Sequence, residues 1–273
     1  MTRPVSALTR SSRHELHPVL LATADAAQRT YLHARAAHSR AELEAVIGIG
    51  ADGTPTMYID DLVETAILEV SAAHGVNVLS EEAGFIDHGS ALTLVIDPLD
   101  GSANAAAGVP LACFSAALAE ENHFTQALTR WLDGNRQWAA AHGTTVGPEP
   151  LRTTGRSDLS GAALSLLRPQ TANRSAWDRL SRQAGRVRVL SCSTLESALV
   201  LTGAVDAFAD PGGDVHRLVD LAAAVVLADA AGGCVLDAHD RPIELDLDLT
   251  HRWSGIVAAT SELAHAVQAQ IAG

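Results

Sequence analysis

The sequence contains no lysine, since all 19 of its basic residues are arginine, against 32 aspartates and glutamates. Without lysine, the chain can have neither a Walker-type phosphate loop nor a Schiff-base nucleophile. The net charge of −13 argues against a nucleic-acid polymer as a partner, because such a partner needs a basic surface. An acidic protein can still bind a small phosphorylated metabolite where local cations or helix N-termini neutralise the phosphate.

Cysteines and long apolar runs are also scarce. Cys113, Cys192 and Cys234 are far apart and lack zinc-ligand spacing, so we expect no metal site and no reactive thiol among them. No apolar run approaches the ~20 residues needed to span a bilayer. Met1 to His17 lack the apolar core of a signal peptide. We therefore expect a cytoplasmic protein with no membrane partner.

Apolar periodicity predicts an α/β protein in which helices and sheets are stacked in layers. The predicted helices are 15–46, divided or continuous, 60–74, 174–184, 194–202, 217–231 and 261–271. The predicted strands are 76–79, 92–96, 111–119, 123–130, 136–141, 163–167, 187–190, 204–209, 233–236 and 255–259. A turn-rich break covers 48–55. A shift to Gly, Pro, Thr and Ser near 143–160 divides an N-terminal subdomain, 1–150, from a C-terminal one, 151–273.

Two carboxylates follow the predicted buried strand 92–96. Pro98 is expected to force a tight turn after Asp97, so that Asp97, Asp100 and the Leu99 carbonyl converge on one point. Gly101 then permits an unusual backbone angle, and Ser102 can cap a following helix. Hard oxygen ligands beside a helix N-terminus suit Mg²⁺ and a phosphate bound together.

Acids at two other places favour a metal site over a simple turn. Asp97 and Asp100 alone fit turn or capping residues equally well. Glu81 follows another strand-like run, and Asp220 begins an Ala-rich helix, where an acid can also simply interact with the helix dipole. Acids at three separate strand or helix ends fit a metal cluster better than chance turns.

These segments resemble the motifs of the inositol monophosphatase family. Residues 97–104 read D-P-L-D-G-S-A-N and are similar to its D-P-[IL]-D-G-[ST]-x-N signature. Residues 80–84 resemble its G-E-E segment, and 219–223 with 230–233 resemble its W-D-x-A-A…E-A-G-G segment. Residues 50–56 are similar to members that hydrolyse both inositol phosphates and fructose bisphosphate. The resemblance runs from about residue 15 to the C-terminus.

The resemblance implies an α-β-α-β-α sandwich and a homodimer. It also implies lithium-sensitive, Mg²⁺-dependent hydrolysis of a phosphate monoester of a small polyol, an inositol or sugar phosphate, by a metal-activated water. Alternatives are a 3′-phosphoadenosine phosphatase, a fructose-1,6-bisphosphatase, and a non-catalytic family member that binds a ligand.

The matching positions carry implied metal-binding roles. Glu81, Asp97 and the Leu99 carbonyl would hold one Mg²⁺, and Asp97, Asp100 and Asp220 a second. A weaker third ion near Glu81 is compatible with this pattern.

Other positions would act on water and phosphate. Asp60, four residues before Glu64, would pair with Ser102 to orient the attacking water beside the Glu81 metal, and Asp61 is the alternative to Asp60. Backbone N–H groups of Gly101 and Ser102 would bind phosphate oxygens.

The substrate side departs from the family pattern. Val219 replaces a tryptophan, and Gly213 stands where the family has an acid, so Asp210 is a candidate for that acid at the start of a longer loop, 211–217. Asp210 would bind substrate hydroxyls or be a plain loop residue. His216 and Arg217 would meet a second phosphate or a base, or be solvated loop residues.

The remaining substrate-side residues lie in one turn. Ser193 and Thr194 match the family's small, polar substrate-side turn, and Glu196 would contact a hydroxyl or lie on a helix surface. The family lysine upstream of Asp60 has no counterpart, which would weaken a third metal site.

Overall fold

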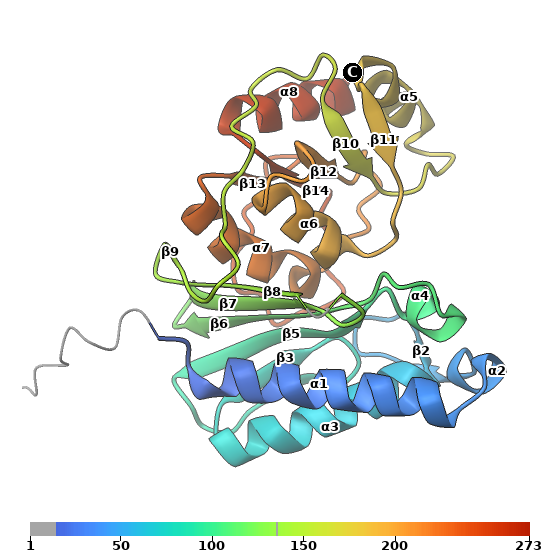
Figure 1. The fold of residues 1–273 in the computed structure, drawn as a ribbon, viewed down its shortest axis with the longest axis vertical. Coiled ribbons are helices and arrows are strands. Elements are labelled where there is room, and N and C mark those ends of the chain that lie inside the picture. Colours follow the sequence, from blue (N-terminus) through green and yellow to red (C-terminus); the bar gives the residue numbers. More distant parts are fainter. Residues whose placement is uncertain (1–14, 135) are drawn as a thin grey trace, which may run out of the picture.

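Helices and sheets alternate in five layers (Figure 1). The computed structural model describes residues 15–134 and 136–273, so the predicted polar N-terminus lies largely outside the described residues. From one side to the other, the layers are a helix pair, a seven-stranded sheet, a second helix pair, a five-stranded sheet and a third helix pair. The pairs are α1 (Pro18–Ala37) with α3 (Tyr58–His74), α6 (Ser193–Leu201) with α7 (Leu218–Ala231), and α5 (Arg174–Gln183) with α8 (Ser261–Ala272). The predicted α-β-α-β-α sandwich is confirmed.

The first sheet carries most of the predicted acids. Its order is β4-β3-β5-β6-β7-β8-β9, in which β3 and β5 are parallel and the other neighbours antiparallel. The strands are β3 (Asn77–Ser80), β4 (Gly84–Ile86), β5 (Leu92–Asp100), β6 (Cys113–Glu120), β7 (His123–Trp131), β8 (Arg136–Ala141) and β9 (Thr144–Thr145). Parallel β3 and β5 end at the same edge of the sheet, which brings the acids that follow β3 near those at the end of β5.

The second sheet has the order β11-β10-β12-β14-β13. Its strands are β10 (Ala163–Leu166), β11 (Arg186–Arg188), β12 (Ala207–Ala209), β13 (Cys234–Asp237) and β14 (Gly255–Ala258). The 146–162 connection, which contains the predicted subdomain boundary, links the two sheets. One buried core nevertheless includes residues from both, such as Trp138 and Phe208. The division at residue 150 stays a prediction.

Helix α7 lies between the two sheets and is apolar apart from Asp220 and the exposed Asp229. Eleven of its 14 residues are buried. An Ala-rich helix suits this position because small side chains let both sheets approach it closely, and a helix without a polar face is stable only when it is covered on all sides. Its first turn, which carries Asp220, lies at the edge where the β3 and β5 acids gather.

Two local predictions are wrong. Residues 44–57 contain no helix: β1 (Val46–Ile49) and β2 (Pro55–Met57) form an antiparallel hairpin around the 50–54 turn, after a short α2 (Arg40–Leu43). The β-branched Val46, Ile47 and Ile49 favour a strand over the end of a helix. Strand β4 was also absent from the predicted elements.

The segment after the 92–96 run is not a tight turn. β5 continues to Asp100, and its pairing with β6 is irregular between Asp97 and Asp100. This irregularity replaces the turn predicted at Pro98. The N-cap of α4 (Ser102–Ala107) is Gly101, so Ser102 is the first helical residue and not the cap. Within the described residues, no helix is both long and apolar enough to cross a membrane.

Candidate functional site

Three carboxylates predicted as metal ligands converge at the junction of β5 and α7. Each of Asp97, Asp100 and Asp220 offers an oxygen, and these oxygens lie within 4.8 Å of one another. Oδ2 of Asp97 is buried and has no hydrogen-bond partner among the described residues. A buried, unpaired carboxylate oxygen is costly unless a cation balances it. The arrangement therefore fits a hard divalent cation.

The pKa values of these acids reflect their crowding. Burial and the charges of the neighbouring acids raise the pKa of Asp97 well above its usual range. Burial also raises the pKa of Asp100, although the Thr194 backbone N–H (2.6 Å) and hydroxyl (2.8 Å) donate to its Oδ2 and oppose the rise. Asp220 differs: burial would raise its pKa, but the charge and hydrogen bonds of Arg217, together with the charge of His216, lower it overall. The cluster binds protons strongly wherever no cation lies against it.

Glu81 follows β3 on the neighbouring side of the cluster. Burial raises its pKa to about 8, against the opposing charge of Arg217. The turn that carries it is held by Glu64 of α3, whose carboxylate accepts hydrogen bonds from the Ser80 hydroxyl and from the Glu82 and Ala83 backbone N–H groups. Helix α3 thus fixes where the Glu81 side chain lies.

Sequence reasoning did not place Arg217 in this cluster. Its Nη1 contacts Glu81 Oε1 and lies 2.9 Å from Asp52 Oδ2. Its Nε is 3.1 Å from Asp220 Oδ2, and Nη2 is 3.2 Å from Asp220 Oδ1. The side chain is only 16% exposed, so the interpretation of Arg217 as a solvated loop residue is wrong. An arginine three residues before a helix-initiating aspartate was the signal that could have indicated this pairing.

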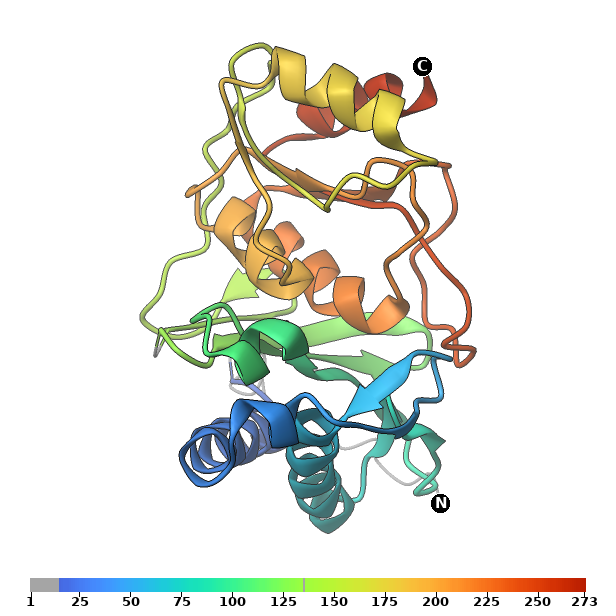
Figure 2. The ribbon, with the colours of Figure 1, turned by 90° about the vertical axis from the view of Figure 1, so that its right-hand side faces the viewer.

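The turn of the β1–β2 hairpin contributes a fifth acid, Asp52. Its side chain is fully buried and also accepts hydrogen bonds from Thr54. Arg252, from the loop between β13 and β14, donates from Nη2 to the Asp52 carbonyl at 2.7 Å. Figure 2 shows this loop beside the hairpin. The C-terminal sheet therefore helps to hold the hairpin against the acidic cluster.

Asp60 and Asp61 occupy different environments. Asp60 is 7% exposed, and burial raises its pKa to about 6, while the Ser102 hydroxyl and the Met57 backbone N–H oppose the rise. Asp61 is exposed. The Ser102 hydroxyl donates to the Leu99 carbonyl at 3.0 Å, which links the Asp60 environment to β5. The geometry supports Asp60 over Asp61 as the partner of Ser102.

Gly101 joins β5 to α4 and cannot carry a side chain here. Its φ is 82°, and an added Cβ would lie 2.6 Å from the Leu111 carbonyl oxygen. The Asn104 side chain donates to the same carbonyl at 3.1 Å and ties α4 to the Leu190 carbonyl at 2.9 Å. These contacts fix the backbone that was predicted to bind phosphate.

One residue of the substrate-side turn before α6 orients a carboxylate of the acidic cluster. Thr194 holds Asp100, whereas Ser193 lines a cavity beside the cluster. Glu196 does not lie on a helix surface, so that interpretation is wrong, and its contact with a substrate hydroxyl stays a prediction. It is fully buried and accepts hydrogen bonds from the Ser165 hydroxyl at 2.5 Å and the Cys192 N–H at 3.2 Å.

The 210–217 loop is also more buried than expected. Asp210 is fully buried, and its two oxygens accept the backbone N–H groups of Gly213 (2.8 Å) and Val215 (2.9 Å). It shapes the loop, and its contact with substrate stays a prediction. His216 is 1% exposed, which makes the solvated-loop interpretation wrong for it too. Val219 fills the tryptophan position as a buried core residue.

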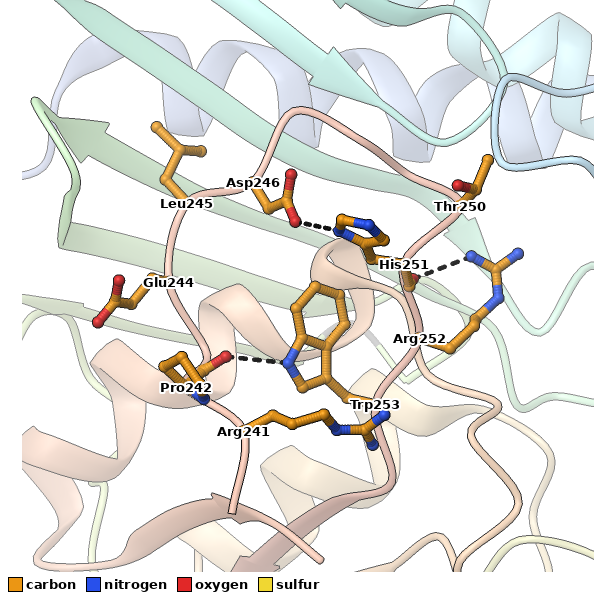
Figure 3. Close-up of a pocket in the computed structure, with 9 residues that line it drawn as sticks. All are labelled: Arg241, Pro242, Glu244, Leu245, Asp246, Thr250, His251, Arg252 and Trp253. Carbon is orange, nitrogen blue, oxygen red and sulfur yellow. Dashed lines mark hydrogen bonds and ion pairs between the residues drawn. The ribbon is translucent and has the colours of Figure 1, made fainter. Parts of the chain in front are cut away.

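A cavity of about 250 Å³ opens beside Asp100 and Asp220. Its other lining residues are Leu167, Arg168, Gln170, Ser191, Ser193, Val215, His216 and Arg217. Another cavity, of about 540 Å³, lies in the loop between β13 and β14, where the Trp253 indole N–H donates to the Pro242 carbonyl at 3.0 Å (Figure 3). The larger cavity lacks the carboxylate cluster, so the smaller one is the candidate substrate site.

Known proteins are similar to this chain in sequence and in fold. The family model for the inositol monophosphatase family matches residues 15–272. A fructose-1,6-bisphosphatase/inositol-1-monophosphatase of Thermococcus kodakarensis is 34% identical over 223 residues, which cover 81% of this chain and 84% of that protein. A bifunctional NADP phosphatase/NAD kinase of Methanococcus maripaludis is 28% identical, over 81% of this chain and 43% of that protein.

A solved structure agrees with these matches. It is a hypothetical protein from Pyrococcus horikoshii, described as having similarities to inositol-1 monophosphatase. Its TM-score is 0.77 with 26% identity, over 92% of this chain and 95% of that one. The sequence match over nearly the whole chain and the layered fold lead to the same conclusion: the chain belongs to the inositol monophosphatase family.

Proposed function

We propose that this phosphatase removes phosphate from a small phosphorylated polyol, an inositol or sugar phosphate, and that it depends on Mg²⁺. The observation that carries the proposal is the convergence of Asp97, Asp100 and Asp220, with an unpaired oxygen of Asp97 buried among them. Together with Glu81 and the Leu99 carbonyl, they form a set of oxygen donors of the kind that Mg²⁺ prefers. Two bound Mg²⁺ ions would supply an activated water and balance charge on the leaving oxygen.

The protein groups around this centre orient the attacking water and fix the positions of the carboxylates. With a pKa of about 6, Asp60 is mostly ionised at neutral pH, so its carboxylate can accept a hydrogen bond from the attacking water. The Ser102 hydroxyl donates to the Leu99 carbonyl, which holds the Ser102 side chain against the end of β5. Thr194 fixes Asp100 through two hydrogen bonds. Positioning of this kind is the main protein contribution to phosphoryl transfer.

The cavity beside the cluster gives a second candidate substrate class. Its volume of about 250 Å³ suits a sugar or cyclitol ring. Within the described residues, no carboxylate pairs with the exposed Arg168 on the wall of this cavity. An arginine without an acidic partner favours a substrate with a second anionic group. Fructose 1,6-bisphosphate, 3′-phosphoadenosine phosphate and NADP belong to this class.

Phosphate release from a substrate panel tests the proposal. The panel contains inositol 1-phosphate, fructose 1,6-bisphosphate, 3′-phosphoadenosine 5′-phosphate and NADP, each assayed with Mg²⁺, without Mg²⁺, and with Mg²⁺ plus Li⁺. We expect release only with Mg²⁺, inhibition by Li⁺, and a loss of at least about 10³-fold in Asp100→Asn. Arg168→Gln should raise the KM for the substrates that carry a second anionic group more than the KM for inositol 1-phosphate.

Two results would contradict the proposal. One is an absence of release from every substrate in Mg²⁺, which would favour a non-catalytic ligand-binding member. The other is equal activity of the wild type and Asp100→Asn. Homodimer formation and a cytoplasmic location, implied by the resemblance and the composition, stay predictions.

A further inference from the structure

Arg217 is a cation built into the acidic cluster. One guanidinium contacts carboxylates from three segments: Asp52 of the β1–β2 turn, Glu81 after β3, and Asp220 of α7. The Arg217 backbone N–H also donates to Asp220 Oδ2, at 2.6 Å. The guanidinium of arginine is always protonated in proteins, so this side chain brings a positive charge to the three carboxylates.

The guanidinium lies to one side of the Asp97–Asp100–Asp220 convergence. It contacts no oxygen of Asp97 or Asp100, and Asp97 Oδ2 has no partner in the described part of the chain. Its Nη1 instead lies between Glu81 and Asp52. Arg217 thus leaves open the Asp97 position while it covers the Glu81–Asp52 side.

The charges of the cluster agree with two divalent cations beside Arg217. Its five carboxylates are Asp52, Glu81, Asp97, Asp100 and Asp220. Two divalent cations and one guanidinium balance five ionised carboxylates. A third divalent cation would need to displace Arg217 from contacts that are largely shielded from water, where an ion pair is expensive to break.

We propose that Arg217 takes the place of a third metal ion, so that the centre holds two divalent cations per chain. This proposal rests on the metal centre of the proposed function. It assigns to Arg217 a role that differs from substrate binding: the guanidinium occupies the position between Glu81 and Asp52 and offsets one of their charges, and an additional cation site opens between these two carboxylates only when Arg217 is removed.

Counting bound ions tests the proposal without an activity assay. Metal-stripped protein is titrated with Mn²⁺, and bound ions are counted by electron paramagnetic resonance, with Mg²⁺ calorimetry in parallel. We expect two ions in the wild type, three in Arg217→Gln and two in Arg217→Lys, which keeps the charge. The matched control is Arg241→Gln, which removes an arginine paired with Asp214 and Asp237 away from the cluster and should leave the count at two.

A measurement on the wild type covers the case in which Arg217→Gln does not fold. The Arg217 Nε–H is followed by NMR during the Mg²⁺ titration, and we expect it to stay hydrogen-bonded and protected from exchange at saturation. Three ions in the wild type, an unchanged count in Arg217→Gln, or release of the Arg217 N–H would overturn the proposal. An absence of any bound ion in the wild type would instead overturn the metal centre itself.

Discussion

Among single residues, the sequence predicted the acids better than their partners. Asp97, Asp100 and Asp220 could be predicted because acids at the ends of apolar elements form a recognisable pattern. The contacts of Arg217 with Asp52 and Glu81 could not, because they depend on segments that only the folded chain brings together. The same reason explains Glu196, whose burial follows from the packing of α6 and not from its neighbours in sequence.

Asp97→Asn should separate metal binding from folding. Asp97 is fully buried among other acids, so removal of its charge relieves repulsion in the metal-free protein. We expect an equal or higher melting temperature without Mg²⁺, together with loss of the stabilisation that Mg²⁺ gives the wild type. Thermal melts with and without Mg²⁺ measure both.

The exposed Asp61 supplies the control for this variant. Asp61→Asn should keep the wild-type response to Mg²⁺, because its side chain lies outside the buried cluster. A full Mg²⁺ response in Asp97→Asn would show that Asp97 is not a ligand.

Among elements, long periodic segments were predicted well and short ones were not. Helices α3, α5, α7 and α8 lie close to their predicted ranges. The β1–β2 hairpin and β4 were missed because strands of three or four residues give little periodic signal, and β1 is exposed along its whole length. The irregular end of β5 was missed because Asp-Pro in sequence indicates a turn as readily as an irregular strand.

Gly101→Ala should distort the backbone that connects β5 to α4. A left-handed φ costs a non-glycine residue about 1–2 kcal/mol, and here the Cβ would also clash with the Leu111 carbonyl. We expect a clear loss of stability and a larger loss of phosphatase activity, measured by chemical denaturation and phosphate release.

Gly75→Ala is the matched control for strain alone. Gly75 has a φ of 62°, ends α3, and has nothing within 4 Å of an added Cβ. The Gly75→Ala variant should lose about 1 kcal/mol of its free energy of unfolding and keep its phosphatase activity. Equal effects of the two substitutions would contradict a specific role for the Gly101 backbone.

At the scale of the whole molecule, the alternation of helices and strands predicted stacked layers, and the order of the layers came from the family resemblance. The packing of both sheets on shared helices did not follow from composition or periodicity, because these carry no direct signal of it. The core that joins Trp138 to Phe208 through α7 is a property of the folded chain alone.

The metal-free protein should lose stability as pH rises. Burial raises the pKa of Glu81 from 4.5 to about 8 and that of Asp60 from 3.8 to about 6. A carboxyl with a raised pKa stabilises the fold below its unfolded pKa, and this contribution disappears as pH rises through the folded value. Between pH about 5 and about 8 we expect the free energy of unfolding to decrease by on the order of a few kcal/mol, which is measured as a falling melting temperature.

Other groups do not reverse this trend. Asp220, whose pKa is lowered from 3.8, changes its contribution below this pH range. Saturating Mg²⁺ should flatten the profile, as should Glu81→Gln in part. A metal-free melting temperature that is constant or rising over this range would contradict the expected shifts.

The position of α7 has a consequence for unfolding cooperativity. One end of this helix lies in the acidic cluster, and its length is packed between both sheets. A ligand that binds only the native state adds its binding free energy to the cost of opening whatever the site depends on. Because neither sheet can separate from α7 without losing core contacts, that free energy opposes the opening of both halves. Metal binding should therefore suppress partial unfolding of the C-terminal half, which supplies only one of the clustered acids, and make the molecule unfold as a single unit.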